Sequence, residues 1–282
     1  MKIKILKEKF YLAGLTSIVL IVLRQIKNLK KNELLHVNIE NIFYSNTKNM
    51  WDKYFYQPFE DKYKLIKNNN YSFVRWNSGK DLNFGYGKKK MNSSLFNKKN
   101  ILSLRGLFKK HIIIKEEIIK KTNKFIDRNI SKQNVISVHI RGTDHFTTGH
   151  AAGQKHLMDY DTYIKPVILK KLTKTKSKKI FLATDENEIY LKFKKDFGKI
   201  LIKNPTTLAK KNSIQSIFQK NVYESEDRKS AMATEVISDI IIMSKCKFSL
   251  CMRSGVSLLN ILMRQDYNYE FIDNHIDYDR MK

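Results

Sequence analysis

The second half of the chain alternates short apolar runs with longer amphipathic segments, and this alternation restricts the fold more than any other feature. Runs such as 135–140 and 179–184 are bounded by polar residues, which is typical of buried strands. The expected strands are 135–140, 179–184, 199–203, 248–252 and 269–273, and the expected helices are 160–172, 186–197, 227–245 and 256–264. Strands separated by helices predict an α/β fold with a parallel, doubly wound sheet.

Near the amino end, the segment 10–23 is apolar and flanked by Lys and Arg, and two interpretations are weighed. A membrane anchor needs about 18–20 apolar residues, and this segment is shorter. No small-residue cleavage site follows it, which disfavours a signal peptide. We favour a strand ending at Gly14, a helix over 15–31 and an extended run over 34–40, which together form a β-α-β unit. The anchor stays open as the alternative.

A polar break at 129–134 separates the two halves of the chain. Before it, a helix is expected from Lys115, because Ile118, Thr122 and Ile126 fall on one face. After it, the strands of the second half begin. We therefore expect two domains, 1–129 and 130–282.

The charge balance is strongly basic, with 54 Lys and Arg against 27 Asp and Glu and a net charge of +27. The lysines are spread along the whole chain, and no Arg-rich helix or zinc-finger spacing accompanies them. A nucleic-acid partner is therefore not expected. We do expect peripheral contact with an anionic membrane surface. The 42% hydrophobic content excludes a disordered polycation, and two cysteines favour a reducing compartment.

Ligands of open α/β sheets bind beyond the carboxyl ends of strands, so the polar residues there are candidates. The run HIRGTD leaves the strand 135–140 and carries His139, Arg141 and Asp144. In extended chain His139 and Arg141 point to the same side. An Arg at a strand end is well placed to bind a diphosphate through two N–H groups. The alternative is an Arg–Asp pair that braces the loop.

Three further polar positions follow the same logic. Asp185 ends the run FLATD, where it either binds ribose hydroxyls or caps the next helix. Asp239 lies one helical turn from Glu235. Its carboxylate is able to accept hydrogen bonds from both N–H groups of a guanine edge. The alternative is that Glu235 and Asp239 form an acidic helix face exposed to solvent. Ser254 precedes the helix over 256–264, where it binds an anion or caps the helix.

Other chemistries lack their motifs in this chain. Four of the seven histidines fall within 139–156, but their spacing is not that of zinc ligands, and no metal site is expected. Neither a Gly-rich dinucleotide loop, a Walker loop nor a G-x-S-x-G turn occurs.

The blocks VHIRGTD, FLATD and ATEVISDIIIMSKCKFSLCMRSGVS resemble, in this order, the GDP-fucose-dependent fucosyltransferases. That group includes core-N-glycan α-1,6-fucosyltransferases, rhizobial nodulation-factor fucosyltransferases and, more distantly, protein O-fucosyltransferases. The resemblance covers about 135–264 and implies a GT-B fold, in which two Rossmann-like domains face a cleft. Residues 1–129 would form the acceptor side, and 130–282 would bind the donor, GDP-fucose. The resemblance implies no metal and no other cofactor.

The resemblance also assigns roles to individual positions. His139 and Asp239 would hold guanine, and Arg141 the diphosphate. Asp144 would orient Arg141 or the leaving group. Asp185 would contact the nucleoside, and Ser254 would contact a phosphate. The backbone of Gly14 would approach the nucleotide.

The HIRGTD motif departs from the α-1,6 enzymes at two positions. Gly142 stands where those enzymes carry a second Arg, so one phosphate contact is missing. Gly149 stands where they carry a Glu, so His145 or His150 is the expected general base, since an imidazole titrates near neutrality.

The expected function is inverting transfer of L-fucose from GDP-β-L-fucose to a glycan, either a surface polysaccharide or a lipid-linked oligosaccharide. The expected location is the cytoplasm, peripherally at the inner face of the membrane. Two alternatives stay open: a GT-B transferase that uses another nucleotide sugar, and a basic polyanion-binding module on a degenerate GT-B fold.

Overall fold

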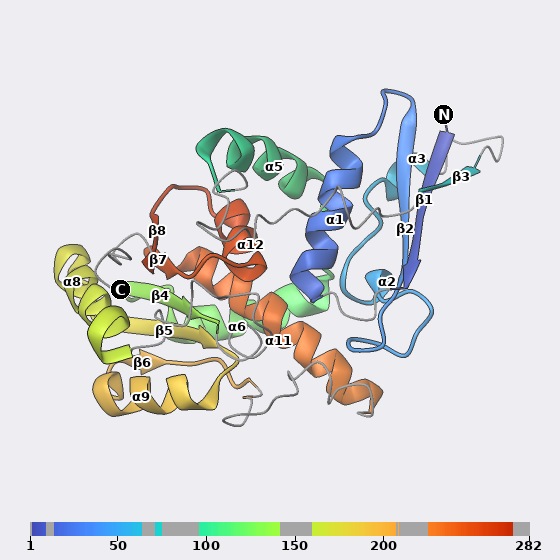
Figure 1. The fold of residues 1–282 in the computed structure, drawn as a ribbon. Helices are drawn as coiled ribbons and strands as arrows, with labels where there is room; N and C mark the ends of the chain where they lie inside the picture. Colours follow the sequence, from blue (N-terminus) through green and yellow to red (C-terminus); the bar gives the residue numbers. More distant parts are fainter. Residues whose placement is uncertain are drawn as a thin grey trace, which may run out of the picture.

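Two parallel sheets organise the protein, which a computed structural model describes over residues 2–9, 14–63, 71–74, 96–141, 160–206, 208 and 225–272. The first sheet has the strand order β2-β1-β3. The elements of the first half are β1 (Lys2–Lys9), α1 (Leu15–Lys27), β2 (Glu33–Glu40), α2 (Trp51–Tyr54), α3 (Glu60–Tyr63), β3 (Tyr71–Val74), α5 (Lys98–His111) and α6 (Glu116–Asn129), as labelled in Figure 1.

The β-α-β opening of the chain is confirmed. Strands β1 and β2 are parallel, with Ile3 beside Leu34, and α1 connects them. The first strand lies earlier than expected because lysines interrupt its apolar residues and only Ile3 and Leu6 are buried, so it lacks an unbroken apolar run. Helix α1 is apolar nearly all round because β2, α5 and α12 pack against it. Within the described ranges, no helix is both long and apolar enough to cross a membrane.

The second sheet is parallel throughout, in the strand order β6-β5-β4-β7-β8. Its elements are β4 (Val135–Ile140), the π-helical turn η2 (Tyr160–Ile164), α8 (Lys165–Thr175), β5 (Lys179–Thr184), α9 (Asn187–Phe197), β6 (Leu201–Ile202), α11 (Glu226–Lys245), β7 (Phe248–Cys251), α12 (Gly255–Met263) and β8 (Tyr269–Phe271). The predicted doubly wound α/β order is confirmed, and β4 and β5 have the predicted bounds. Strand β6 is shorter than expected.

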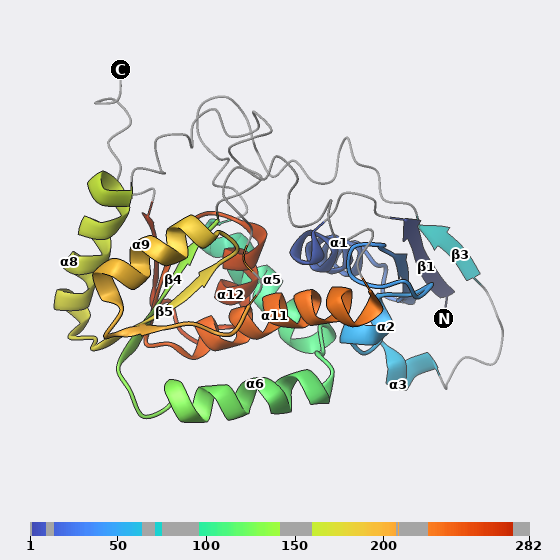
Figure 2. The same cartoon turned by 90° about the horizontal axis from the view of Figure 1, so that it is seen from below.

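Alternation along the strands assigns the helices to two faces of this sheet. Ile136, Val138 and Ile140 of β4 belong to the apolar cluster that includes residues of α8 and α9. Val135, which precedes Ile136 and points to the opposite face, belongs to the other cluster, together with residues of α6, α11 and α12. The result is a three-layer arrangement, with α8 and α9 on one side of β4 and β5 and α6 and α11 on the other (Figure 2).

The first half packs directly on the helices of the second sheet. Helix α5 packs on α12, where Arg105 Nη2 donates to the carbonyl of Ile261 at 3.0 Å. Helix α6 packs on α11, although α6 precedes the predicted boundary after residue 129. The division into 1–129 and 130–282 stays a prediction.

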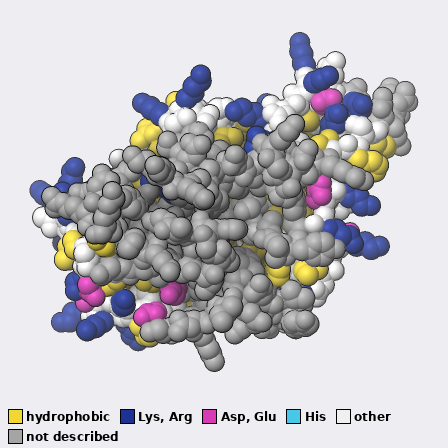
Figure 3. All heavy atoms as spheres, in the orientation of Figure 1, with side chains coloured by type: hydrophobic (Ala, Val, Ile, Leu, Met, Phe, Trp, Pro, Cys, Tyr) yellow, Lys and Arg dark blue, Asp and Glu magenta, His cyan; other side chains and the backbone are white. Residues whose placement is uncertain are grey.

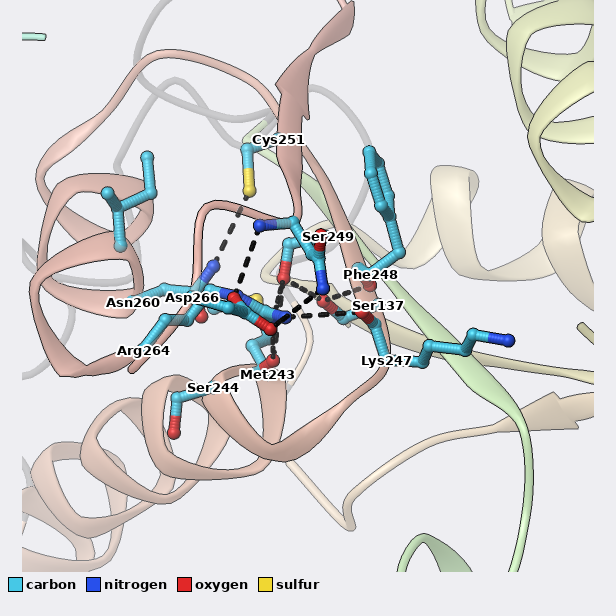
Figure 4. A network of polar contacts seen from close by, with 12 residues as sticks. Ser137, Met243, Ser244, Lys247, Phe248, Ser249, Cys251, Asn260, Arg264 and Asp266 are labelled. Carbon is cyan, nitrogen blue, oxygen red and sulfur yellow. Dashed lines mark hydrogen bonds and ion pairs between the residues drawn. The ribbon is translucent and has the colours of Figure 1, made fainter. Parts of the chain in front are cut away.

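A buried arginine network joins α11, β7 and α12 at the amino edge of the second sheet (Figure 4). Arg264 is 2% exposed, and all five of its N–H donors have partners. Those acceptors are the two carboxylate oxygens of Asp266, the carbonyls of Met243 and Lys247, and the hydroxyl of Ser249. Ser249 Oγ in turn lies 2.7 Å from Ser137 Oγ of β4. The network ties the end of α11 to the start of β7 and the end of α12.

Candidate functional site

The carboxyl edge of the second sheet collects polar residues from four neighbouring strands. Because the strands are parallel, β6, β5, β4 and β7 all end at this edge, where ligands of such folds bind. The polar residues that follow these strands are Lys203 and Asn204 after β6, Asp185 and Glu186 after β5, Arg141 after β4, and Arg253 and Ser254 after β7. The predicted positions Arg141, Asp185 and Ser254 therefore share one edge.

Asp239 on α11 is the buried carboxylate of this edge. It is 9% exposed and accepts a hydrogen bond at Oδ1 from Asn204 Nδ2 at 3.0 Å. The solvated acidic face considered for this residue is therefore wrong. Burial raises the pKa of Asp239 to about 7, although the charge of Lys203 and the Asn204 hydrogen bond oppose the rise. The carboxylate thus titrates near neutrality, and Oδ2 has no hydrogen-bond partner in the described chain.

Lys203 is a partly buried cation that lies near three carboxylates of this edge. Burial lowers its pKa, and the nearby carboxylates of Asp239, Glu235 and Asp185 oppose that shift. The structure therefore brings two predicted residues, Asp185 and Asp239, into one electrostatic cluster. Lys203 and Asn204 were not predicted, and the available signal was a polar pair directly after an apolar strand.

Glu186 is a second carboxylate that the sequence reasoning missed. Its Oε2 is buried and has no hydrogen-bond partner in the described chain. Burial, and after it the charges of Asp185 and Glu188, raises the pKa of Glu186 to about 7. Glu186 also occupies the N-cap position of α9, where no side-chain cap hydrogen bond forms. The N-cap position of α9 therefore belongs to Glu186 and not to Asp185. Consecutive acids at a strand end were the available signal.

His139 is held in one orientation by α12. It is 5% exposed, and its Nδ1 lies 2.9 Å from Ser257 Oγ. Ser257 Oγ donates its single proton to the carbonyl of Met252 at 2.5 Å, so Nδ1 must carry the proton shared with Ser257. When the ring is neutral, this tautomer leaves Nε2 as the acceptor nitrogen.

Ser254 caps α12, which is one of the two roles considered for this residue. Its Oγ accepts from the backbone N–H of Ser257 at 3.2 Å, and it is 3% exposed. The cap does not exclude the second role, because backbone N–H groups at a helix amino end still favour an anion.

The amino ends of α1 and α12 meet beside this edge. A Cβ on Gly255 would lie 2.4 Å from Thr16 Oγ1, so the absence of a side chain at Gly255 permits the close contact. Gly14 is the N-cap of α1, two residues before Thr16, and it has extended backbone. The predicted position Gly14 therefore lies near the first turn of α12, which places two helix amino ends at the junction of the two halves (Figure 1).

Part of the predicted site lies outside the described residues. Asp144, His145 and His150 fall in the stretch 142–159, together with the two motif departures at Gly142 and Gly149. In the part of the chain that is described, no three His, Cys, Asp or Glu side chains gather as metal ligands would. Metal independence stays a prediction.

Comparisons with known proteins were made by sequence and by structure. No family model matches the chain, and no curated protein matches it significantly. A structure of NodZ α-1,6-fucosyltransferase soaked with GDP-fucose shares the fold, with a TM-score of 0.54, 12% identity and coverage of 93% of this chain and 92% of that chain. The fold is that of the GT-B fucosyltransferases.

Two further structures agree with this finding. Fucosyltransferase NodZ from Bradyrhizobium has a TM-score of 0.54 at 13% identity, covering 92% of this chain and 91% of its own. POFUT1 in complex with GDP has a TM-score of 0.50 at 12% identity, with coverage of 96% and 98%. The expectation of a GT-B fold is confirmed, and these neighbours belong to the group that the sequence motifs resemble.

Proposed function

We propose that the protein transfers L-fucose from GDP-β-L-fucose to a glycan acceptor, with inversion and without a metal. One observation carries the proposal: the carboxyl edge of the second sheet is polarised. The buried carboxylate of Asp239 lies toward β6 and β5, whereas Arg141 and the amino end of α12 lie toward β4 and β7. This polarity matches a guanosine diphosphate, whose base presents N–H donors and whose diphosphate is anionic. The fold shared with NodZ soaked with GDP-fucose supports the same choice.

Guanine is the base that the acidic end fits. Its N1–H and exocyclic amino group point the same way, and ionised Asp239 accepts both, with Asn204 holding Oδ1. His139 is proposed to accept a hydrogen bond from guanine at Nε2. Asp185, at the end of β5, is proposed to accept hydrogen bonds from the ribose hydroxyls.

Fucosyl transfer breaks the bond between the sugar C1 and the β-phosphate oxygen, and negative charge grows on the departing GDP. Arg141, the backbone N–H groups of α12 and Ser254 are the groups proposed to stabilise that charge. His145 or His150 is proposed to take the proton of the acceptor hydroxyl, and Asp144 to orient Arg141.

The acceptor and the location are also proposals. A surface polysaccharide or lipid-linked oligosaccharide fits a cytoplasmic enzyme that touches an anionic membrane through its net charge of +27. On the face seen in Figure 3, the described Lys and Arg side chains lie at separate places around the rim.

Calorimetric titration with GDP in the presence of EDTA tests the donor class. We expect micromolar binding of GDP and GDP-fucose and much weaker binding of UDP and UDP-sugars. Equal binding of UDP would redirect the proposal to another nucleotide sugar. Absence of any nucleotide binding by folded protein, together with salt-sensitive binding of nucleic acid, would overturn it in favour of the polyanion-binding module.

Transfer itself needs a separate measurement. Release of GDP from GDP-fucose in the presence of candidate glycans, with and without EDTA, identifies the acceptor and tests metal independence. A product with the α-linkage from the β-linked donor establishes inversion, and a β-linked product would contradict it.

A further inference from the structure

Arg253 follows β7 at the same level at which Arg141 follows β4. The two strands are neighbours, with His139 beside Cys251, and the ladder continues as Met252 N donates to the carbonyl of His139 at 3.1 Å. Counting two residues onward from this pair leads to Arg141 on one strand and Arg253 on the other, each just beyond the end of its strand.

The guanidinium of Arg253 is supported by an aromatic ring. Its Cζ lies 4.4 Å from the centroid of Phe271, which ends the neighbouring strand β8 and is 6% exposed. Phe96 contacts that ring edge-on at 5.0 Å between centroids. Stacking occupies the face of a guanidinium, whereas its N–H donors point outward in its plane, so a stacked Arg still binds a phosphate.

The position of Arg253 along the edge distinguishes it from Arg141. From β6 to β7 the edge presents Asp239 and Asn204, then Asp185, then Arg141, and finally Arg253 with the amino end of α12. A guanosine diphosphate bound along this edge, with its base at the acidic end, places the α-phosphate near β4 and the β-phosphate near β7.

We infer that Arg253 binds the β-phosphate of the donor and stabilises the charge that it gains on leaving. This inference rests on the proposed function and extends it by one residue. In the transfer step the C1–O bond to the β-phosphate breaks, and its electron pair stays on the phosphate oxygen. A new bond forms between C1 and the acceptor oxygen, whose proton passes to the general base. Arg253 thus supplies a second cation from β7, where Gly142 leaves the HIRGTD motif with one Arg.

The test compares GDP with GMP, because only GDP has the β-phosphate. We expect Arg253→Met to lower GDP affinity about 10- to 100-fold and to leave GMP affinity unchanged, since a charge-assisted contact is lost at one phosphate only. Arg253→Lys should recover part of the loss, because it keeps the charge without the planar fork. Arg141→Met should weaken GDP and GMP together.

Lys98→Met is the matched control, because Lys98 Nζ also lies over an aromatic ring, 5.5 Å from the centroid of Tyr267, away from the edge. It should leave both affinities unchanged. Thermal melting of each variant establishes that the binding data describe folded protein.

The outcomes separate this inference from the proposed function. If wild type binds GDP with guanine selectivity but Arg253→Met leaves GDP affinity unchanged, or lowers GDP and GMP affinity equally, the role of Arg253 is overturned and the function stands. If folded wild type binds no guanine nucleotide, both fail. A single-turnover rate with GDP-fucose that falls in Arg253→Met beyond the loss in donor affinity would support charge stabilisation in the transfer step.

Discussion

At the amino edge of the second sheet, Arg264 uses all five N–H donors inside the protein, whereas at the carboxyl edge Asp239 accepts one hydrogen bond, from Asn204. Both side chains are buried, and α11 contributes to both clusters through Met243 and Asp239. The pKa values of the two acids, Asp266 and Asp239, reflect this difference in hydrogen bonding. Burial acts to raise the pKa of Asp266, but the hydrogen bonds and charge of Arg264 bring it below its usual value. At Asp239 burial prevails and the pKa rises to about 7.

The comparison separates a polar cluster that stabilises the fold from one that is incomplete without a ligand. A buried charge is tolerated at low cost when every donor and acceptor is used, as at Arg264. An acid held near its titration point with an unpartnered oxygen is typical of a binding or catalytic site. The amino edge is therefore structural, and the carboxyl edge is where guanine would complete the hydrogen bonds.

The largest expected effect is on stability at the amino edge. Arg264→Ala should lower the free energy of unfolding by about 3–5 kcal/mol, because it removes a buried guanidinium whose five N–H donors all have partners. Urea denaturation monitored by circular dichroism measures the change. Lys247→Met, at an exposed side chain beside the network, is the control and should change stability little. A loss below about 1 kcal/mol would contradict the structural role.

Asp239→Asn should act mainly on binding. The amide keeps the shape of the side chain but loses the anionic acceptor pair, so we expect GDP affinity to fall about 10- to 100-fold and guanine selectivity to disappear. Calorimetry with GDP and UDP measures both quantities. Unchanged GDP affinity would show that the base is read elsewhere. Activity per folded molecule in Arg264→Lys should, in contrast, resemble wild type.

GDP affinity should depend on pH through Asp239. Because its pKa is about 7 and only the ionised form accepts two N–H groups, affinity should fall as pH drops below 7. Removing the hydrogen bond that favours the anion, with Asn204→Ala, should move the midpoint to higher pH. Removing the negative charge of Glu235, with Glu235→Gln, should move it to lower pH. Shifts in the same direction for both variants would contradict the assignment to Asp239.

The smallest expected effect is a gain of stability in Asp239→Asn. The folded-state pKa of this acid is raised above its ordinary value of 3.8, so the folded protein binds more protons and loses stability as pH rises from about 4 to 7. Asn does not titrate and avoids that cost. We expect the variant to melt about 2–4 °C higher than wild type at pH 8 and to converge with it toward pH 4. A variant that is less stable than wild type at pH 8 would show that Lys203 depends on the Asp239 charge.

Local pattern was sufficient to predict the order of the elements in the second half of the chain. A strand buried on both faces is mostly apolar along its whole length, so β4 and β5 were predicted with their bounds. Strand β1 was misplaced because only Ile3 and Leu6 are buried and lysines interrupt its apolar residues. Asp185 and Asp239 were expected at this edge because the end of a parallel strand and the period of a helix place them without knowledge of distant contacts, and both lie near Lys203.

The contacts that complete the site depend on packing between elements far apart in the chain. Asn204 reaches Asp239 only because β6 lies at the edge of the sheet beside α11, and Ser257 sets the tautomer of His139 only because α12 packs under β4. Arg253 lies over Phe271 because β8 pairs with β7. The sequence by itself determined the order of the strands and helices in the second half and the bounds of β4 and β5, because local periodicity reports burial. Tertiary structure alone decided which polar groups share a partner, since hydrogen bonds and pKa shifts depend on distances across the fold.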